Sequence, residues 1–153
     1  SGQMAEHIRR VCGGRALNII DIGSGAGFPG LVLSIMGVGA VSLVESNTKK
    51  CSFMRQVIRK TGATASVVNG RIESLAPQSV DIVTSRACAT IAQLLTWSRP
   101  FCGQNTELWL LKGENVDKEL TEAKKTWKMG VERFASKSSA GGCVLRLSGI
   151  KHI

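Results

Sequence analysis

Residues 21–30 read Asp-Ile-Gly-Ser-Gly-Ala-Gly-Phe-Pro-Gly and follow directly on an apolar run, residues 17–22. Such a run predicts a strand that is covered on both faces, and Pro29 is typical of the first turn of a helix. Glycines between a strand and a helix let the backbone come close to a ligand. The helix N-terminus beyond them offers unpaired N–H groups. The stretch therefore predicts a ligand-binding turn.

Short β-branched runs alternate with amphipathic stretches on the C-terminal side of this turn. Further strands are predicted at 41–45, 65–69, 80–85 and 107–111, with closing strands at 131–135 and 143–147. Helices are predicted at 47–61, at 90–97 and from 115, the last from the 3.6-residue stripe Val116, Leu120, Ala123 and Trp127. This alternation predicts a single α/β domain over residues 1–153. Its expected architecture is Rossmann-like, a mostly parallel seven-stranded sheet with helices on both faces.

The glycines fit two ligand-binding patterns. Residues 25–30 match G-x-G-x-x-G, which would indicate NAD or FAD, but Pro29 lacks an N–H that a pyrophosphate would use. Residues 21–27 match D-x-G-x-G-x-G, which has a carboxylate at the strand end. A carboxylate repels a pyrophosphate and attracts the ammonium and sulfonium groups of S-adenosylmethionine. We favour this methyl donor. Its candidate contacts in the loop are Asp21, Gly23, Ser24, Gly25 and Gly27.

Glu45 is the second acidic residue of the predicted site, because it ends the strand 41–45 that follows the turn. A carboxylate at this strand end can accept hydrogen bonds from both hydroxyls of a ribose. Glu45 is therefore expected to hold the ribose of the donor.

Three later strand ends carry polar residues at the edge where open α/β sheets bind ligands. After the third strand, Ile72 could pack on an adenine ring and Glu73 could read its amino edge, or Glu73 could be a solvated helix start. After the fourth strand, where a methyl acceptor would lie, Arg86 could position a phosphate or a base. Lys112 ends the fifth strand and is a candidate RNA phosphate contact. Both basic residues could also be ordinary surface side chains.

The sequence has 20 lysines and arginines against 11 acidic residues, which gives a formal net charge of +9. Such a surplus attracts polyanions through counterion release, and nucleic acid is the commonest partner of this kind, ahead of a membrane surface. Basic residues without an acidic neighbour share one predicted face of the helix 47–61. They are Lys49, Arg55, Arg59 and Lys60. We expect this face to bind RNA, although plain solvation explains it equally well.

Five cysteines, an odd number without C-x-x-C spacing, indicate free thiols in a reducing compartment and neither a disulfide frame nor a zinc site. No metal is expected. Residues 1–7 lack the apolar core of a signal peptide. No apolar run reaches the roughly 18 residues that a membrane span requires. A cytoplasmic protein is expected, monomeric and without a membrane partner.

Several stretches, in this order, resemble a known family. They are Asp21 to Gly30, Ser85-Arg86-Ala87 and Leu111-Lys112-Gly113. Together they resemble the bacterial small-subunit ribosomal RNA guanine-N7 methyltransferase G family, also called glucose-inhibited division protein B. The string Gly-x-Gly-x-Gly-Phe-Pro-Gly is far more specific than a bare glycine loop. Residues 44–53 also resemble the family's second motif, an acidic residue followed by a basic helix.

The resemblance implies a class I methyltransferase fold and methyl transfer from S-adenosylmethionine to N7 of a guanosine in the 530 loop of 16S ribosomal RNA. The substrate would be the RNA or the small ribosomal subunit. The implied donor contacts are Gly23, Phe28, Ile72, Glu73 and Arg86, with Glu45 at the ribose. Family members generally begin with a longer helical segment, and residues 1–14 are predicted to be its remnant. Residues 143–151 match the family's last strand only loosely.

N7 of guanine keeps a lone pair in the neutral base, so its methylation needs aligned reactants and no general base. We therefore expect no His, Cys or Ser nucleophile. Cys88, which has no adjacent base, is expected to be a spectator, and Arg86 is expected to order the active site. Two alternatives stay open, namely a methyltransferase of a small molecule or protein, and a non-catalytic RNA- or nucleotide-binding protein. Donor titration and the salt dependence of substrate affinity would separate them.

Overall fold

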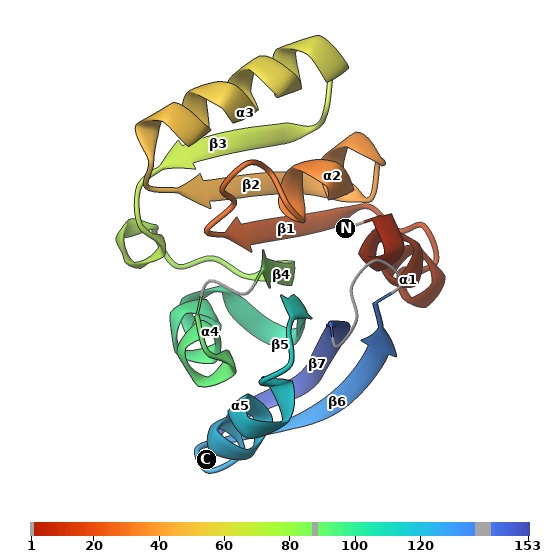
Figure 1. Cartoon of the computed structure of the whole chain (residues 1–153), viewed down its shortest axis with the longest axis vertical. Helices are drawn as coiled ribbons and strands as arrows, with labels where there is room; N and C mark the ends of the chain where they lie inside the picture. The colour runs from red at the N-terminus through yellow and green to blue at the C-terminus, as the bar shows by residue number, and fades with distance from the viewer. Residues whose placement is uncertain (1, 87–88, 137–141) are drawn as a thin grey trace.

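A computed structural model describes residues 2–86, 89–136 and 142–153 (Figure 1). Seven strands lie within these residues and form one sheet in the order β3-β2-β1-β4-β5-β7-β6. Their bounds are Leu17–Ile22 (β1), Gly39–Glu45 (β2), Ala65–Asn69 (β3), Val80–Arg86 (β4), Cys102–Lys112 (β5), Trp127–Ala135 (β6) and Cys143–His152 (β7). Strands β1 to β5 pair in parallel, and β7 pairs antiparallel with both β5 and β6. The predicted mostly parallel seven-stranded sheet is confirmed.

One described helix precedes β1, and the others lie between strands. The helices are Gly2–Cys12 (α1), Gly30–Ile35 (α2), Thr48–Thr61 (α3), Ile91–Ser98 (α4) and Val116–Ala123 (α5), with 3-10 turns at Ile72–Ser74 (η1) and Arg99–Phe101 (η2). The caps of α3 explain why its bounds could be predicted. The side chain of Asn47 accepts a hydrogen bond from the N–H of Lys50, and Gly62 ends the helix with a φ of 67°.

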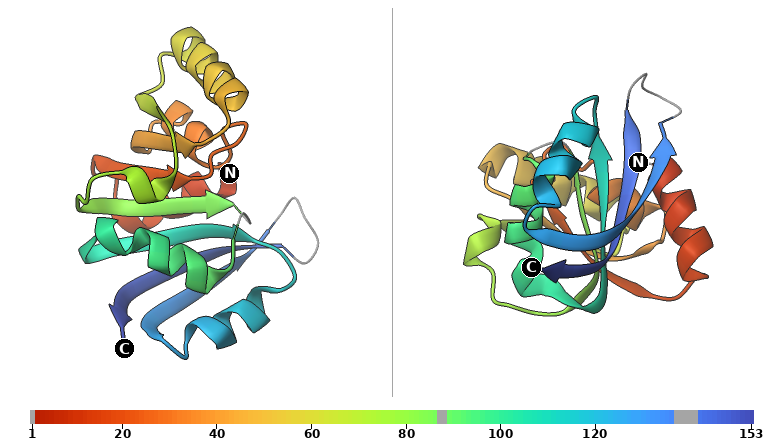
Figure 2. Two further views of the ribbon diagram at one scale, coloured as in Figure 1. Left: turned by 90° about the vertical axis from the view of Figure 1, so that its left-hand side faces the viewer. Right: turned by 90° about the horizontal axis from the view of Figure 1, so that it is seen from below.

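Helices cover both faces of the sheet, as the alternating sequence predicts. On one face, buried side chains of α1, α2 and α3, among them Ile8, Leu33 and Met54, pack on the sheet. On the other face, α4 and α5 pack on it through side chains such as Leu94 and Leu120. Figure 2 (right) shows α1 and the α4–α5 pair on opposite sides of the strands. Each side of the sheet therefore has its own core.

The carboxyl ends of the central strands meet at one edge of the sheet. Ile22, the last residue of β1, is in register with Val44 of β2 and with Ser85 of β4. The arrowheads of β1, β2 and β3 all point toward this edge, at the left in Figure 1. Strand order reverses between β1 and β4, and crevices at such a reversal are where open α/β sheets bind ligands. The fold thus brings the predicted site residues to a single edge.

The prediction for the last helix was wrong in one respect. Trp127 does not continue α5, because the helix ends at Ala123 and Trp127 is the first residue of β6. The N–H groups of Lys125 and Thr126 bond to Glu122 and Ala123, and these bonds close a turn that ends the helical path. Trp127 is nevertheless 6% exposed and belongs to the same core as α5, so its predicted place in the core is confirmed.

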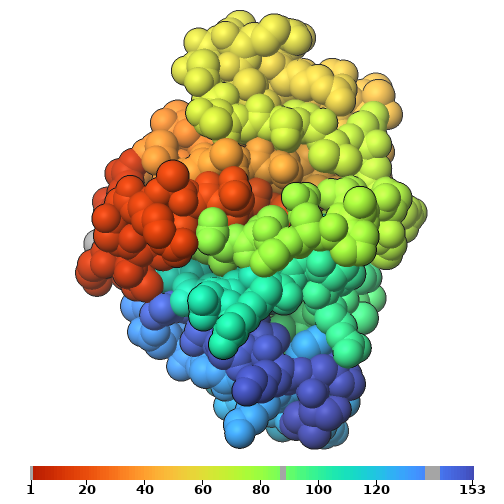
Figure 3. Space-filling view, turned by 180° about the vertical axis from the view of Figure 1, so that it is seen from behind, coloured from red at the N-terminus to blue at the C-terminus, as the bar shows by residue number. Residues whose placement is uncertain are grey.

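The molecule is elongated along the sheet, with α3 at one end and the β6–β7 pair at the other. Figure 3 shows these two ends from behind, in yellow and in blue. No helix in the described part of the chain is both long enough and apolar enough to cross a membrane.

Candidate functional site

The glycine loop folds back over the end of the neighbouring strand. The N–H groups of Gly23 and Ser24 both donate to the carbonyl of Val44, at 2.9 and 3.1 Å. The backbone has positive φ at Gly23 (66°), Gly25 (57°) and Gly27 (105°). Side-chain-bearing residues rarely adopt this conformation. A glycine at every second position is therefore what allows the chain to make this turn.

Asp21 lies at the end of β1, buried between the glycine loop, β4 and the first turn of α2. Its side chain is fully buried, and Oδ1 accepts a hydrogen bond of 2.6 Å from the hydroxyl of Thr84 on β4. The first turn of α2 presses against the same carboxylate, because a Cβ on Gly30 would lie 2.5 Å from Asp21 Cγ. Burial raises the pKa of Asp21 from 3.8 to about 6, and the hydrogen bond from Thr84 partly opposes this rise. The Asp21 carboxylate does not reach the surface in this structure, and its expected direct contact with a donor stays a prediction.

Glu45 ends β2 and joins the glycine loop to the start of α3. Its Oε1 accepts a hydrogen bond of 2.8 Å from the N–H of Gly25, and its Oε2 accepts one of 2.9 Å from the N–H of Asn47. The side chain is only half-buried. An ionised carboxylate has about four lone-pair sites. Both oxygens can therefore still accept hydrogen bonds from a ligand.

A pocket of about 190 Å³ lies between the loop, the end of β2 and η1. It is lined by Ile22, Gly23, Val44, Glu45, Ser46, Gly70, Arg71, Ile72, Glu73 and Trp97. Four of the predicted donor contacts, Gly23, Glu45, Ile72 and Glu73, thus share one pocket. Arg71 and Trp97 also line it and were not predicted as site residues. Trp97 lines the pocket from α4. It belongs to no sequence motif, so sequence reasoning could not identify it.

The other predicted loop residues lie outside this lining. Ser24 and Gly27 are buried within the turn, and Gly25 is half-buried beside Glu45. Phe28, by contrast, is 44% exposed. Buried Ser24 and Gly27 shape the loop, while Phe28 presents an aromatic ring to its outer surface.

Arg86 ends β4 with an exposed side chain, next to the carboxyl end of β1. It is in register with Leu111 of β5, which places it at the same edge of the sheet as the pocket. The neighbouring Cys88, predicted to be a spectator, lies outside the described residues. Cys12, Cys51, Cys102 and Cys143 are free thiols, as predicted for them.

Lys112 does not lie on the surface in this structure, and its predicted contact with an RNA phosphate stays a prediction. Its side chain is 3% exposed, and Nζ lies 2.7 Å from Oε1 of Glu119 on α5. Nζ also donates a hydrogen bond of 2.8 Å to the carbonyl of Ala89. The lysine is therefore held inside by an ion pair with α5 and by a backbone carbonyl.

The basic face of α3 is exposed as predicted. The helix buries Cys51 and Met54 against β2 and β3, which leaves its charged side chains on the outside. Lys49, Arg55, Arg59 and Lys60 are all exposed. Phe53, 50% exposed, lies on the same helix. The helix therefore presents positive charge and one aromatic ring to solvent.

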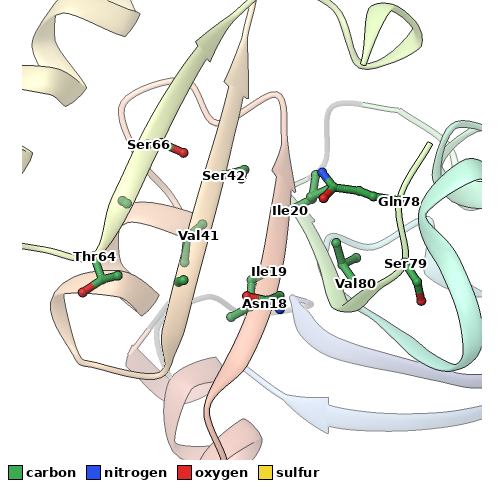
Figure 4. A pocket seen from close by; sticks show the side chains of 12 residues that line it. Asn18, Ile19, Ile20, Val41, Ser42, Thr64, Ser66, Gln78, Ser79 and Val80 are labelled. Atoms are coloured by element: carbon green, nitrogen blue, oxygen red, sulfur yellow. The ribbon is translucent and has the colours of Figure 1, made fainter. Parts of the chain in front are cut away.

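A further pocket of about 410 Å³ crosses the amino-terminal halves of β1, β2 and β3, away from the glycine loop (Figure 4). Small polar side chains such as Ser42, Ser66 and Gln78 line it, and none of its described lining residues is charged. It contains none of the predicted site residues.

Solved structures with a similar fold show to which class of fold this chain belongs. A SAM-dependent methyltransferase from Aquifex aeolicus superposes with a TM-score of 0.70 at 15% identity, over 94% of this chain and 88% of its own. A ribosomal protein L11 methylase from Lactobacillus delbrueckii subsp. bulgaricus gives a TM-score of 0.76 at 11% identity, over 97% of this chain and 77% of its own. The fold is therefore that of the class I S-adenosylmethionine-dependent methyltransferases.

Sequence relatives narrow the class to one family. Residues 4–142 match the family model described as GidB, rRNA small subunit methyltransferase G. The ribosomal RNA small subunit methyltransferases G of Paramagnetospirillum magneticum and Rhodospirillum rubrum are each 46% identical over 86% of this chain. The chain belongs to the rRNA small subunit methyltransferase G family. It spans 64% and 66% of the length of these two curated relatives.

Proposed function

We propose that the protein transfers a methyl group from S-adenosylmethionine to N7 of a guanosine in the 530 loop of 16S ribosomal RNA. The observation that carries this proposal is the pocket at the carboxyl ends of β1 and β2, where the glycine loop and the Glu45 carboxylate meet. Family membership supports ribosomal RNA as the substrate.

The residues of the pocket fit the methyl donor. Glu45 offers a half-buried carboxylate with spare lone pairs at the place of the ribose. Ile72 and Trp97 supply apolar surface for the adenine ring, and the exposed carboxylate of Glu73 can accept from its amino group. No diphosphate is expected in this pocket, because Glu45 and Glu73 would both repel it. Asp21, Ser24, Gly25 and Gly27 would hold the loop in shape, and Phe28 would close its outer side.

The bound donor supplies an electrophilic methyl group, and guanine N7 supplies the lone pair, so the protein's own work is alignment. Arg86 lies at the end of β4, where its guanidinium can order the acceptor by a phosphate or by a base edge. The exposed basic residues of α3 would attract RNA without regard to sequence. They are Lys49, Arg55, Arg59 and Lys60.

The proposal also includes the domain organisation, the oligomeric state and the cellular location of the protein. Residues 1–153 would act as one donor-binding domain. In the structure α1 contributes Met4, Ala5 and Ile8 to the core, which supports its role as part of this domain. We expect a monomer that works in the cytoplasm, where 16S RNA and small subunits are available.

The test is to incubate the protein with tritiated methyl donor and either free 16S RNA or small ribosomal subunits, and then to map the label. The expected result is label on N7 of one guanosine of the 530 loop. Label on protein or on a small molecule would reassign the substrate. Calorimetry without any donor binding would remove the enzymatic function altogether and leave an RNA-binding protein of the same fold.

A further inference from the structure

Residues 89–91, at the start of α4, are hydrogen-bonded to a buried ion pair between Lys112 and Glu119. Lys112, the last residue of β5, donates from Nζ to the carbonyl of Ala89 at 2.8 Å. Glu119 of α5 accepts a hydrogen bond of 3.0 Å from the N–H of Ile91, the first residue of α4. The same Oε1 of Glu119 lies 2.7 Å from Lys112 Nζ. One ion pair thus holds one backbone acceptor and one backbone donor of the segment 89–91.

The ion pair satisfies a backbone group that needs a partner outside its helix. The N–H of Ile91 belongs to the first turn of α4, where N–H groups have no partner within the helix. A carboxylate is favoured at that end of a helix because of the helix dipole. The ammonium group of Lys112 is almost completely buried and would be costly there without its two oxygen partners. The contacts are therefore mutually dependent.

The held segment begins three residues after Arg86, at the edge of the sheet where the methyl acceptor is expected. Arg86 itself is fixed by its register with Leu111, the neighbour of Lys112. Ala89 and Thr90 also line an open pocket of about 420 Å³, whose other walls are the β5–α5 connection and the side chains of Lys112 and Glu119. The ion pair and the residues that it holds, Ala89 and Thr90, therefore line the same pocket.

We infer that the Lys112–Glu119 ion pair is a positioning clamp for the acceptor side of the active site, and that Lys112 acts through the segment 89–91 and not by contact with RNA. This inference rests on the proposed methyl transfer. The clamp holds the backbone of residues 89–91 in one arrangement before the substrate arrives. It should therefore contribute to kcat, with little effect on donor affinity or on the electrostatic part of RNA binding.

The variants Lys112→Met and Glu119→Gln test the clamp. Lys112→Met removes the charge at similar length, and Glu119→Gln keeps an acceptor for the Ile91 N–H but loses the ionic partner of Lys112. We expect at least a tenfold fall in kcat for Lys112→Met and a smaller fall for Glu119→Gln, with KM for RNA and Kd for the donor changed less than twofold. Lys112→Arg, which keeps the cation, should recover part of the lost kcat. The matched control is Lys125→Met, which breaks the exposed Lys125–Glu122 pair of the same region and should change nothing.

Two further measurements separate the clamp from its alternatives. Amide hydrogen exchange at Ile91 should accelerate at least tenfold in Lys112→Met and should stay unchanged in Lys125→Met. The salt dependence of RNA affinity should be the same in Lys112→Met as in the original chain. A reduced salt slope with an unchanged kcat would make Lys112 a phosphate contact and overturn the inference, as would unchanged exchange at Ile91.

The design distinguishes this inference from the proposed function. If the unaltered chain methylates no RNA, the proposed function fails, and positioning for that reaction fails with it, while exchange at Ile91 still decides whether the clamp exists. If the unaltered chain is active and Ile91 exchange rises without any loss of kcat, the positioning role alone is overturned. Should Lys112→Met not fold, the milder Glu119→Gln variant gives the same comparison.

Discussion

Glu45 Oε1 accepts the N–H of Gly25 at 2.8 Å, so the last residue of β2 holds the glycine loop that follows β1. Its other oxygen holds the N–H of Asn47, the N-cap of α3. One carboxylate therefore has two structural bonds in addition to its proposed role at the ribose. This arrangement makes the effect of substitutions at position 45 predictable.

Glu45→Ala should lower the affinity for S-adenosylmethionine at least tenfold, because the ribose loses its acceptor and the loop loses its tether. Glu45→Gln should have an affinity between those of the original chain and Glu45→Ala, because the amide NH2 that replaces one carboxylate oxygen cannot accept the N–H that faces it. Isothermal titration calorimetry checks both, with Glu122→Ala on α5 as an exposed acidic control. An unchanged affinity in Glu45→Ala would end the ribose assignment.

Asp21→Asn should change how stability depends on pH. The folded chain binds the Asp21 proton with a pKa of about 6, against 3.8 for an ordinary Asp. Between these pH values the folded state holds more protons than the unfolded state, so the free energy of unfolding falls as the pH rises through this window. The loss should reach about 3 kcal/mol above pH 6. Asparagine does not titrate, so the difference in unfolding free energy between the two chains should change by most of this amount, about 2.4 kcal/mol, between pH 4 and pH 7 in urea unfolding. Parallel curves would contradict the buried carboxylate.

Gly30→Ala should destabilise the fold although alanine is the better helix former. The new Cβ would lie 2.5 Å from Asp21 Cγ, and neither the buried carboxylate nor α2 can move aside freely. Overpacking of this kind costs about 1–3 kcal/mol. The control is Gly113→Ala, where a Cβ would meet nothing within 4 Å. Urea unfolding of both variants checks the prediction, and equal midpoints would refute it.

Arg86→Ala should reduce methyl transfer by roughly 100-fold, the order of loss expected when a reactant is misplaced by about 1 Å. The far-ultraviolet circular dichroism should be unchanged, because the side chain is exposed at the end of β4. Arg10→Ala on α1 is the matched control for removing one exposed arginine. Normal turnover in Arg86→Ala would exclude it from the active site.

Neutralising the basic face of α3 should weaken RNA binding and flatten its salt dependence. Each lost contact to a single-stranded phosphate should reduce the slope of log K against log salt by about 0.7. The variant replaces Arg55, Arg59 and Lys60 by Gln. The charge-matched control replaces Lys118, Lys124 and Lys128, which are exposed at the α5–β6 end of the molecule. Equal slopes in the two variants would mean that the α3 residues make no specific phosphate contacts and that only the net charge of the protein matters.

Local signals in the sequence were sufficient for most of the elements and for the centre of the site. The Asn47 and Gly62 caps define α3, and the alternate glycines after Asp21 define the loop, because both depend on the conformations of single residues. The strand end at Glu45 follows from the apolar run before it. These features need no knowledge of distant contacts.

The misplaced residues depend on contacts between distant segments. Trp127 continues the 3.6-residue spacing of α5, but the turn at Lys125 and Thr126 sends it into β6, where it pairs with β7. Lys112 is polar and ends a strand, yet α5 covers it and Glu119 neutralises it. Trp97 of α4 lines the same pocket as Ile72 and Glu73 of η1, although the two elements are far apart in the sequence. Periodicity and residue type carry no information about such partners.

The position of β7 has a consequence for anyone who trims this protein. The family match ends at residue 142, one residue before β7 begins, yet β7 is an interior strand that joins β5 to β6. A fragment cut at the limit of the match would leave β6 without its partner and would expose the hydrogen-bonding edge of β5. Bare strand edges associate with other chains. Such a truncation should therefore aggregate, even though every recognisable motif is still in it.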